Sequence, residues 1–290
     1  MGTQLDGAVT VRGGLRRAHS ARRLGVEAAR RALQRTGRRP GEVELLVNCG
    51  LFRDRNIGEP ALAPMIQQDL GANPEDPHPG GHGTFSFDVA NGACGVLSAL
   101  EIADRFLRAG TIGTALVVTS DADPGHGLAP GFPFEAAGGA VLCTWREPSP
   151  GLGTVHWRHV DAGDGDFVAT VGDSDEGNVL VVREGAAFVG KAAGAAAEAA
   201  LAALADAGVK PSDVDVVVGG LDRPGYRARF AEATGIDGRR LVTAGPRQHT
   251  VALLSALERA GRAGELAAGR SVLLICAGAG VTAGAVLFRP

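Results

Sequence analysis

The chain of 290 residues is long enough for one large or two smaller domains, and a hydrophobic content of 45% supports a sizeable core. A net charge of −3 argues against nucleic acid as a partner. The four scattered cysteines form no C-x-x-C pair, which argues against a disulfide scaffold or a zinc ribbon and suits a reducing cytoplasm. No signal peptide or apolar run of membrane length is recognised, so we expect a cytoplasmic protein without a membrane anchor.

The first predicted helix reads SARRLGVEAARRALQRTG over residues 20–37. Leu24, Val26, Ala29 and Leu33 place an apolar stripe along one side of it. Ten arginines lie between residues 12 and 39, and those within the helix lie on its other side. Because no aromatic side chains interleave with them, we interpret this side as a solvated helix face rather than a phosphate or nucleic-acid site.

Residues 51–83 are less regular. They contain a loop, a short predicted helix over 61–70, and a Pro/Gly-rich segment that favours turns. His78 and His82 lie in that segment. They are four residues apart on a loop rather than on a helix, so the spacing does not predict a metal pair, and we expect no metal.

Residues 85–123 combine a strand, a tight turn, a helix and a second strand. FSFDV alternates as a strand does, ANGACG supplies two glycines for the turn, and apolar residues recur at helical spacing up to Gly110. ALVV then reads as a buried strand. After the Gly/Pro loop of 125–135, GGAVLCTW predicts another strand.

Cys94 lies in this turn, at the expected start of the helix. A helix N-terminus and free backbone N–H groups favour a thiolate, which makes Cys94 a plausible nucleophile. The alternative is that Cys94 is a buried small hydrophobe, as most free cysteines are. For Cys49, Cys143 and Cys276, which lie inside apolar runs, the second interpretation is much stronger.

The chain is internally duplicated. EAARRALQRTGRRPGEVELLV recurs as EAALAALADAGVKPSDVDVVV, with Pro211 answering Pro40, and GGAVLCT near Gly139 recurs as AGAVLF near Gly284. Two α/β halves are therefore expected, 1–150 and 151–290, around a pseudo-twofold axis, with 147–185 as their connection. Residues 85–89 and 241–244 should occupy equivalent places.

Three segments then carry a family resemblance: FDVANGACGVLSALEIADRFLRAGTIGTALVVTSDA, EAAGGAVLCT, and ELAAGRSVLLICAGAGVTAGAVLFRP. In this order they resemble the type III 3-oxoacyl-(acyl carrier protein) synthases of the thiolase superfamily. The resemblance implies a five-layer α/β/α/β/α fold and a dimer. It also implies that the edge strand FSFDV pairs with its counterpart in another subunit, with the loop around 57–60 at that interface.

The family uses a Cys-His-Asn triad and an oxyanion hole, and the resemblance assigns Cys94, His249 and Gly280 to these roles. The match is imperfect. An ungapped alignment places Ala93 at the nucleophile position and Gly220 at the histidine position, and His249 falls near the family asparagine. The N-terminal segment is also expected to lack the family's first strand and its Trp/Arg-bearing grip on coenzyme A.

Two functions remain open. The chain is an acyltransferase or condensing enzyme in which Cys94 accepts an acyl group and His249 is the base, or it is a non-catalytic subunit paired with an active homologue. A third, less favoured reading is a ligand-binding module unrelated to thioesters. The expected substrate is an acyl thioester on coenzyme A or an acyl carrier protein, without another cofactor, and the expected assembly is a homodimer or heterodimer.

Overall fold

Two mixed β-sheets, one two-stranded hairpin and six α-helices make up the described part of the protein, in a computed structural model that describes residues 1–14, 20–73, 83–161, 163, 165–172 and 178–290. The first sheet has, in spatial order, β1 (Gly2–Arg12), β5 (Ala137–Arg146), β4 (Thr114–Asp121), β2 (Leu45–Asn48) and β3 (Phe85–Asp88). The second has β11 (Leu241–Thr243), β10 (Val216–Gly219), β12 (Val272–Gly278), β13 (Thr282–Arg289) and β6 (Gly151–Leu152), and β7 (His156–His159) also pairs with β13.

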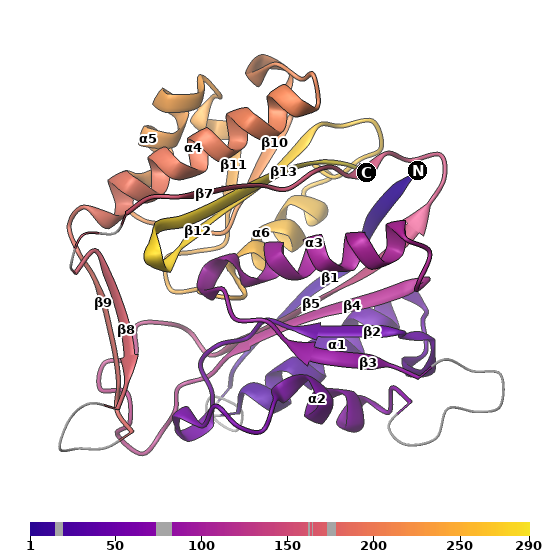
Figure 1. Ribbon diagram of the computed structural model, residues 1–290, viewed down its shortest axis with the longest axis vertical. Helices are drawn as coiled ribbons and strands as arrows, with labels where there is room; N and C mark the ends of the chain where they lie inside the picture. Colours follow the sequence, from indigo (N-terminus) through magenta and orange to yellow (C-terminus); the bar gives the residue numbers. More distant parts are fainter. Residues whose placement is uncertain (15–19, 74–82, 162, 164, 173–177) are drawn as a thin grey trace.

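The helices make three layers around these sheets (Figure 1). The middle layer consists of α3 (Gly95–Arg108) and α6 (Ala252–Arg262), and buried residues from both sheets pack against it. The outer layers are α1 (Ala21–Thr36) with α2 (Leu62–Leu70), on the first sheet, and α4 (Phe188–Asp206) with α5 (Tyr226–Thr234), on the second. The order of layers is therefore α/β/α/β/α, as expected.

The two sheets repeat one topology. In the first sheet, β3 is a parallel edge strand, followed by the parallel strands β2 and β4 and by the antiparallel β5. In the second sheet, β11, β10, β12 and β13 occupy the same four places in the same order. The 3₁₀ turns η1 (Pro40–Glu42) and η4 (Pro211–Asp213) precede β2 and β10 in the same way. The predicted equivalence of 85–89 and 241–244 is confirmed, because β3 and β11 are both parallel edge strands.

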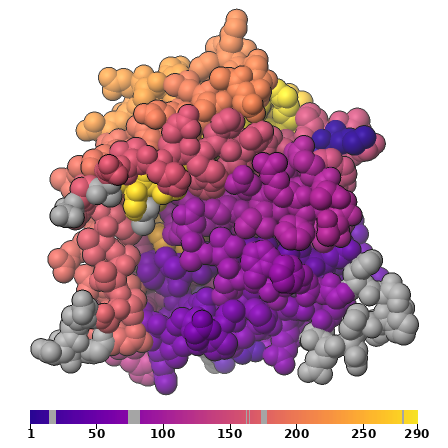
Figure 2. Space-filling model, in the orientation of Figure 1, coloured from indigo at the N-terminus to yellow at the C-terminus, as the bar shows by residue number. Residues whose placement is uncertain are grey.

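Strands β1 to β5, all before residue 147, build the first sheet, and strands β6, β7 and β10 to β13, all after residue 150, build the second. Figure 2 shows the first half, indigo to magenta, below the orange-to-yellow residues of the second half. One sequence expectation was wrong here. The N-terminal segment does contain a first strand, since β1 pairs with β5 along most of its length. The connection 147–185 carries strands of its own: β6 and β7 extend the second sheet, and β8 (Phe167–Val171) pairs with β9 (Leu180–Glu184) in a hairpin.

Local sequence explains where α1 begins and ends. The hydroxyl of Ser20 accepts a hydrogen bond from the backbone N–H of Arg23 and caps α1, and Gly37 ends the helix in a left-handed conformation (φ 68°).

By length and composition, α4 is the one helix in the described residues that could span a membrane. More than half of it is buried, where it packs on β13, β12 and α5, as the core helix of a globular fold does.

Candidate functional site

Cys94 lies where the sequence predicted it, at the N-terminus of α3. The 3₁₀ turn η3 (Gly92–Cys94) leads directly into the helix, and Cys94 occupies the N-cap position. Gly92 has φ 48°, a left-handed conformation that a glycine adopts without steric strain. The side chain of Cys94 makes no capping hydrogen bond, so the helix N-terminus does not hold its sulfur.

The thiol of Cys94 is enclosed. It is 0% exposed, and its Sγ donates to the carbonyl oxygen of Thr282 at 3.4 Å. Cys276 of β12 lies beside it, and a Cβ built on Gly278 would be 3.6 Å from the same sulfur. The contact with Cys276 and the burial together raise the pKa of Cys94 well above its ordinary value. This environment keeps the thiol protonated, whereas a nucleophile needs the thiolate.

The two positions at which the resemblance places the catalytic cysteine and histidine, Ala93 and Gly220, lie close to Cys94 and Cys276 but carry no reactive group. Ala93 is buried in η3, and a Cβ on Gly278 would lie 3.4 Å from its methyl group. A Cβ on Gly220 would lie 3.7 Å from Cβ of Cys276 and 3.6 Å from that of Leu253, which is ordinary contact. Both positions therefore face the surroundings of Cys94 and Cys276.

His249 has a different set of neighbours. Its Nδ1 is 3.4 Å from Oδ2 of Asp121, a separation that suits an ion pair better than a short hydrogen bond. Its ring stacks on Phe134 with centroids 4.5 Å apart and lies 5.0 Å from the ring of Phe52. These neighbours include none of those that surround Cys94, so the described contacts do not form a Cys94–His249 pair.

Asp121, at the end of β4, is the carboxylate that orders this second region. Its Oδ1 accepts from the backbone N–H of Phe52, and its Oδ2 accepts from both the N–H and the hydroxyl of Thr250. Burial pushes the pKa of Asp121 upward. The charge and hydrogen bonds of His249, Phe52 and Thr250 outweigh that effect and leave the pKa lowered. No local pattern predicts this pair, because 128 residues separate Asp121 from His249.

Gly280 lies in η6 (Ala279–Val281), the turn between β12 and β13. Its φ of 66° is the left-handed conformation, and the residue is exposed. The role in an oxyanion hole that the resemblance assigns to Gly280 stays a prediction. His78 and His82 lie outside the described residues, and no group of three potential metal ligands occurs within the described part of the chain.

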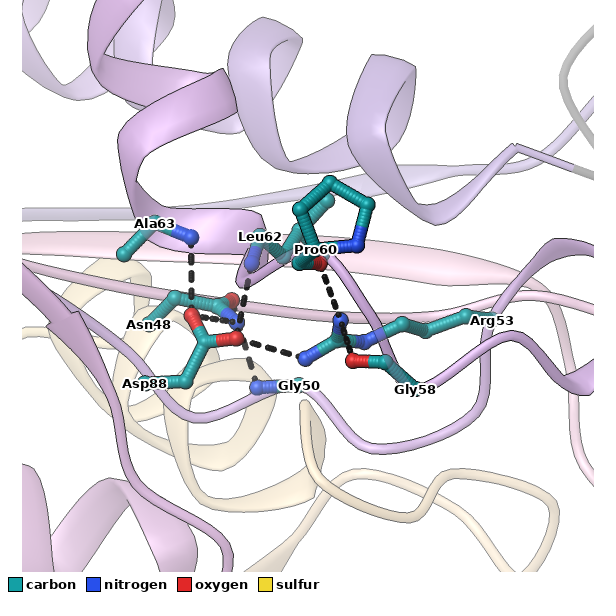
Figure 3. A network of polar contacts seen from close by, with 8 residues as sticks. All are labelled: Asn48, Gly50, Arg53, Gly58, Pro60, Leu62, Ala63 and Asp88. Atoms are coloured by element: carbon teal, nitrogen blue, oxygen red, sulfur yellow. Dashed lines mark hydrogen bonds and ion pairs between the residues drawn. The ribbon is translucent and has the colours of Figure 1, made fainter.

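A polar network around Asp88 was not predicted (Figure 3). The carboxylate, at the end of β3, accepts from the backbone N–H groups of Leu62 and Ala63 at the start of α2, each at 2.7 Å. It also accepts from Asn48, at 3.1 Å, and pairs with Arg53 at 2.6 Å. Arg53 in turn donates to the carbonyl oxygens of Gly58 and Pro60, which lie in the loop between Arg53 and α2.

This network fixes the loop 53–63 at the free edge of β3. Ile57, at the tip of the loop, is 50% exposed, and Phe85 on the edge strand is 60% exposed. Two large apolar side chains thus face solvent beside a strand edge that has no partner among the described strands.

Comparison with solved structures decides the fold. A 3-oxoacyl-(acyl carrier protein) synthase III from Aquifex aeolicus VF5 matches with a TM-score of 0.81 and 21% identity, over 100% of both chains. The priming β-ketosynthase of the R1128 polyketide pathway matches with a TM-score of 0.82 and 21% identity, over 99% of this chain and 96% of that one.

The chain has the thiolase fold of the 3-oxoacyl-(acyl carrier protein) synthase III enzymes. A variant of OleA from Xanthomonas campestris also matches, with a TM-score of 0.79 and 18% identity, over 100% of this chain and 97% of that one. No family model matches the sequence. Within this synthase III-like fold, the enclosed thiol of Cys94 is the feature that any functional assignment has to explain.

Proposed function

We propose that this chain is a non-catalytic subunit of a ketosynthase III-like condensing enzyme, paired with an active homologue. The observation that carries the proposal is the environment of Cys94, whose sulfur is fully buried against Thr282 and Cys276. An acyl acceptor must present a thiolate to a thioester carbonyl, and this sulfur has neither the access nor the charge.

The neighbouring positions support the same conclusion. Ala93, one residue before Cys94, has only a methyl group, and Gly220 has no side chain to act as a base. A shift of one residue near a helix start turns the side-chain direction by about 100°, so Cys94 does not replace a nucleophile at position 93. The free edge of β3, with exposed Phe85 and Ile57, offers a surface for the active partner.

A second candidate is an acyltransferase that uses Cys94 and His249. The observation that favours it is the buried pair of His249 and Asp121, because an imidazole beside a carboxylate is a common arrangement for a general base. For this mechanism, the chain would have to bring His249 to Cys94 and expose the sulfur, a different arrangement from the one described.

Acyl loading distinguishes the two. The purified chain is incubated with several acyl thioesters of coenzyme A and of an acyl carrier protein, and its intact mass is measured. We expect no adduct on this chain. A co-expressed homologue should be loaded instead, and it should lose condensing activity when this chain is absent. An adduct that disappears in Cys94→Ala and forms more slowly in His249→Ala would establish the acyltransferase instead.

Ala93→Cys is the matched positive control. It places a thiol one position earlier, where the resemblance puts the nucleophile, and leaves Cys94 in place. Loading of this variant but not of the wild type would show that a thiol at position 93 accepts an acyl group in this fold and that Cys94 does not.

A further inference from the structure

Two surface cavities occupy equivalent places in the duplicated fold. The first, of about 340 Å³, lies where α3 and α4 end, and the second, of about 440 Å³, lies where α6 and α1 end. The helices α3 and α6 correspond in the two halves, as do α4 and α1, so the α3–α4 cavity and the α6–α1 cavity are two copies of one feature. Figure 1 shows α3 ending beside the two ends of the chain, and Met1 and Arg289 line the α3–α4 cavity there.

Each cavity is lined by a carboxylate and by the arginine four residues after it on the same helix. Asp104 pairs with Arg108 at 3.2 Å in the α3–α4 cavity, and Glu258 pairs with Arg262 at 2.6 Å in the other. Both arginines lie in the last turn of their helix, where the negative end of the helix dipole favours a cation. Their charges are therefore balanced within the fold.

The cavities differ in the arginine that ends a strand. In the α6–α1 cavity this is Arg146, at the end of β5, and its guanidinium pairs with Asp6 at 2.8 Å. In the α3–α4 cavity it is Arg289, at the end of β13, which is partly buried and pairs with no carboxylate in the part of the chain that the structure describes. A partly buried charge without a counter-ion costs free energy. An anion bound at Arg289 would supply the ion pair that the other cavity already has.

The carboxylates of the α3–α4 cavity leave no place for a cationic ligand. Asp104 is paired with Arg108, and Oδ2 of Asp206 lies 3.5 Å from Nε2 of His156. Another part of the wall is apolar and is formed by Leu152, Ala203, Ala207 and Leu287. The cavity thus combines one uncommitted guanidinium with a surface that gains from contact with hydrocarbon.

We propose that the α3–α4 cavity binds a small organic carboxylate, whose anionic group pairs with Arg289 and whose hydrocarbon part lies against Leu152 and Leu287. A guanidinium offers two parallel N–H donors, which match the two oxygens of a carboxylate. Inorganic phosphate is a poorer match, because it would leave the apolar wall in water. The site is separate from the surroundings of Cys94, which lies at the other end of α3, roughly 20 Å away along the helix.

Hexanoate is the probe, and its binding to the complete chain is measured at pH 7.5 by titration with ligand-observed NMR. Hexan-1-ol, hexylammonium and inorganic phosphate are compared at the same ionic strength. Hexanoate should bind saturably, and each of the other three at least about tenfold more weakly, because each lacks either the anionic group or the hydrocarbon part.

Two variants locate the site, and a third is the control. Arg289→Gln should weaken hexanoate binding at least about tenfold. Ala207→Leu should also weaken it, because the larger side chain fills part of the cavity and leaves Arg289 in place. Arg146→Gln removes the strand-end arginine of the α6–α1 cavity and should retain wild-type affinity. Thermal unfolding establishes that each variant is folded.

Unchanged affinity in Arg289→Gln, an equal loss in Arg146→Gln, or no saturable binding by the wild type would each overturn the proposal. Binding of the alcohol, the amine or phosphate as tightly as hexanoate would overturn it as well, because the ligand class would then be wrong. None of these results depends on acyl loading or on a homologous partner, so the proposed function is tested separately.

Discussion

Asp104 of α3 and Glu258 of α6 are equivalent residues of the two halves, and each binds a threonine of the same strand, β1. Asp104 accepts from the hydroxyl of Thr3 at 2.8 Å, and Glu258 accepts from the N–H and the hydroxyl of Thr10 at 3.0 and 2.6 Å. Each carboxylate is buried and pairs with the arginine four residues later. The duplicated middle helices thereby hold β1 near both ends.

Removing either carboxylate should destabilise the fold. Asp104→Ala and Glu258→Ala each leave a threonine and an arginine without their partner, which we expect to lower the free energy of unfolding by about 1–3 kcal/mol. The two threonines are about 23 Å apart along the strand, so the effects should add. Urea unfolding measures them. Glu27→Ala, which removes an exposed ion pair, is the control and should change stability by less than about 1 kcal/mol. Losses no larger than in this control would contradict the clamping role.

The cysteines should be unreactive in the folded protein. All four are buried; burial raises the pKa of Cys49 to about 12, and the pKa of Cys94 is also raised. Below these values the thiols of Cys49 and Cys94 stay protonated, and burial keeps the reagent away from all four sulfurs, so native alkylation by iodoacetamide between pH 7 and 9 should leave the mass unchanged. In urea all four should react. Rapid native alkylation of Cys94 in the wild type would refute the enclosed environment described for it.

The pair of Asp121 and His249 predicts a dependence of stability on pH. The folded state lowers the pKa of Asp121, so the stabilisation is complete above the unfolded value of about 3.9 and is lost as pH falls through the lower folded value. Asp121→Asn should therefore be less stable than the wild type at pH 7. The difference should narrow below about pH 4. Urea unfolding from pH 3 to pH 7 measures it, with exposed Glu232→Gln as the control for loss of a carboxylate. A constant difference across this range would be inconsistent with ionised Asp121.

The network around Asp88 should matter for assembly as well as for stability. Asp88→Ala removes the acceptor for Arg53 and for the start of α2, and we expect a loss of about 1–3 kcal/mol together with weaker binding of the homologous partner. Phe85→Lys should weaken that binding without a comparable loss of stability, because the side chain is exposed. Light scattering of the purified complex reports the assembly. Wild-type assembly in both variants would place the interface elsewhere.

A duplicated, layered α/β fold could be predicted from the sequence, because the signals for it were local and repeated. Helical and strand periodicities, the turns at Pro40 and Pro211, and the second copy of each unit all indicated the same layered α/β architecture. The first strand, β1, was not predicted from the sequence, because its assignment as a strand depends on pairing with β5 about 130 residues later. The sequence also placed Cys94 correctly at the start of α3, because a glycine-rich turn and a periodic helix are both short-range features.

The surroundings of each candidate residue, in contrast, are known only from the folded chain. The neighbours of Cys94 come from β12 and β13, nearly 190 residues away, and they determine that its sulfur is buried and protonated. His249 likewise meets Asp121 and the phenylalanines because β4 and the loops of the first half converge on it. Burial and proximity raise or lower a pKa, and neither is encoded in the spacing of residues along the chain.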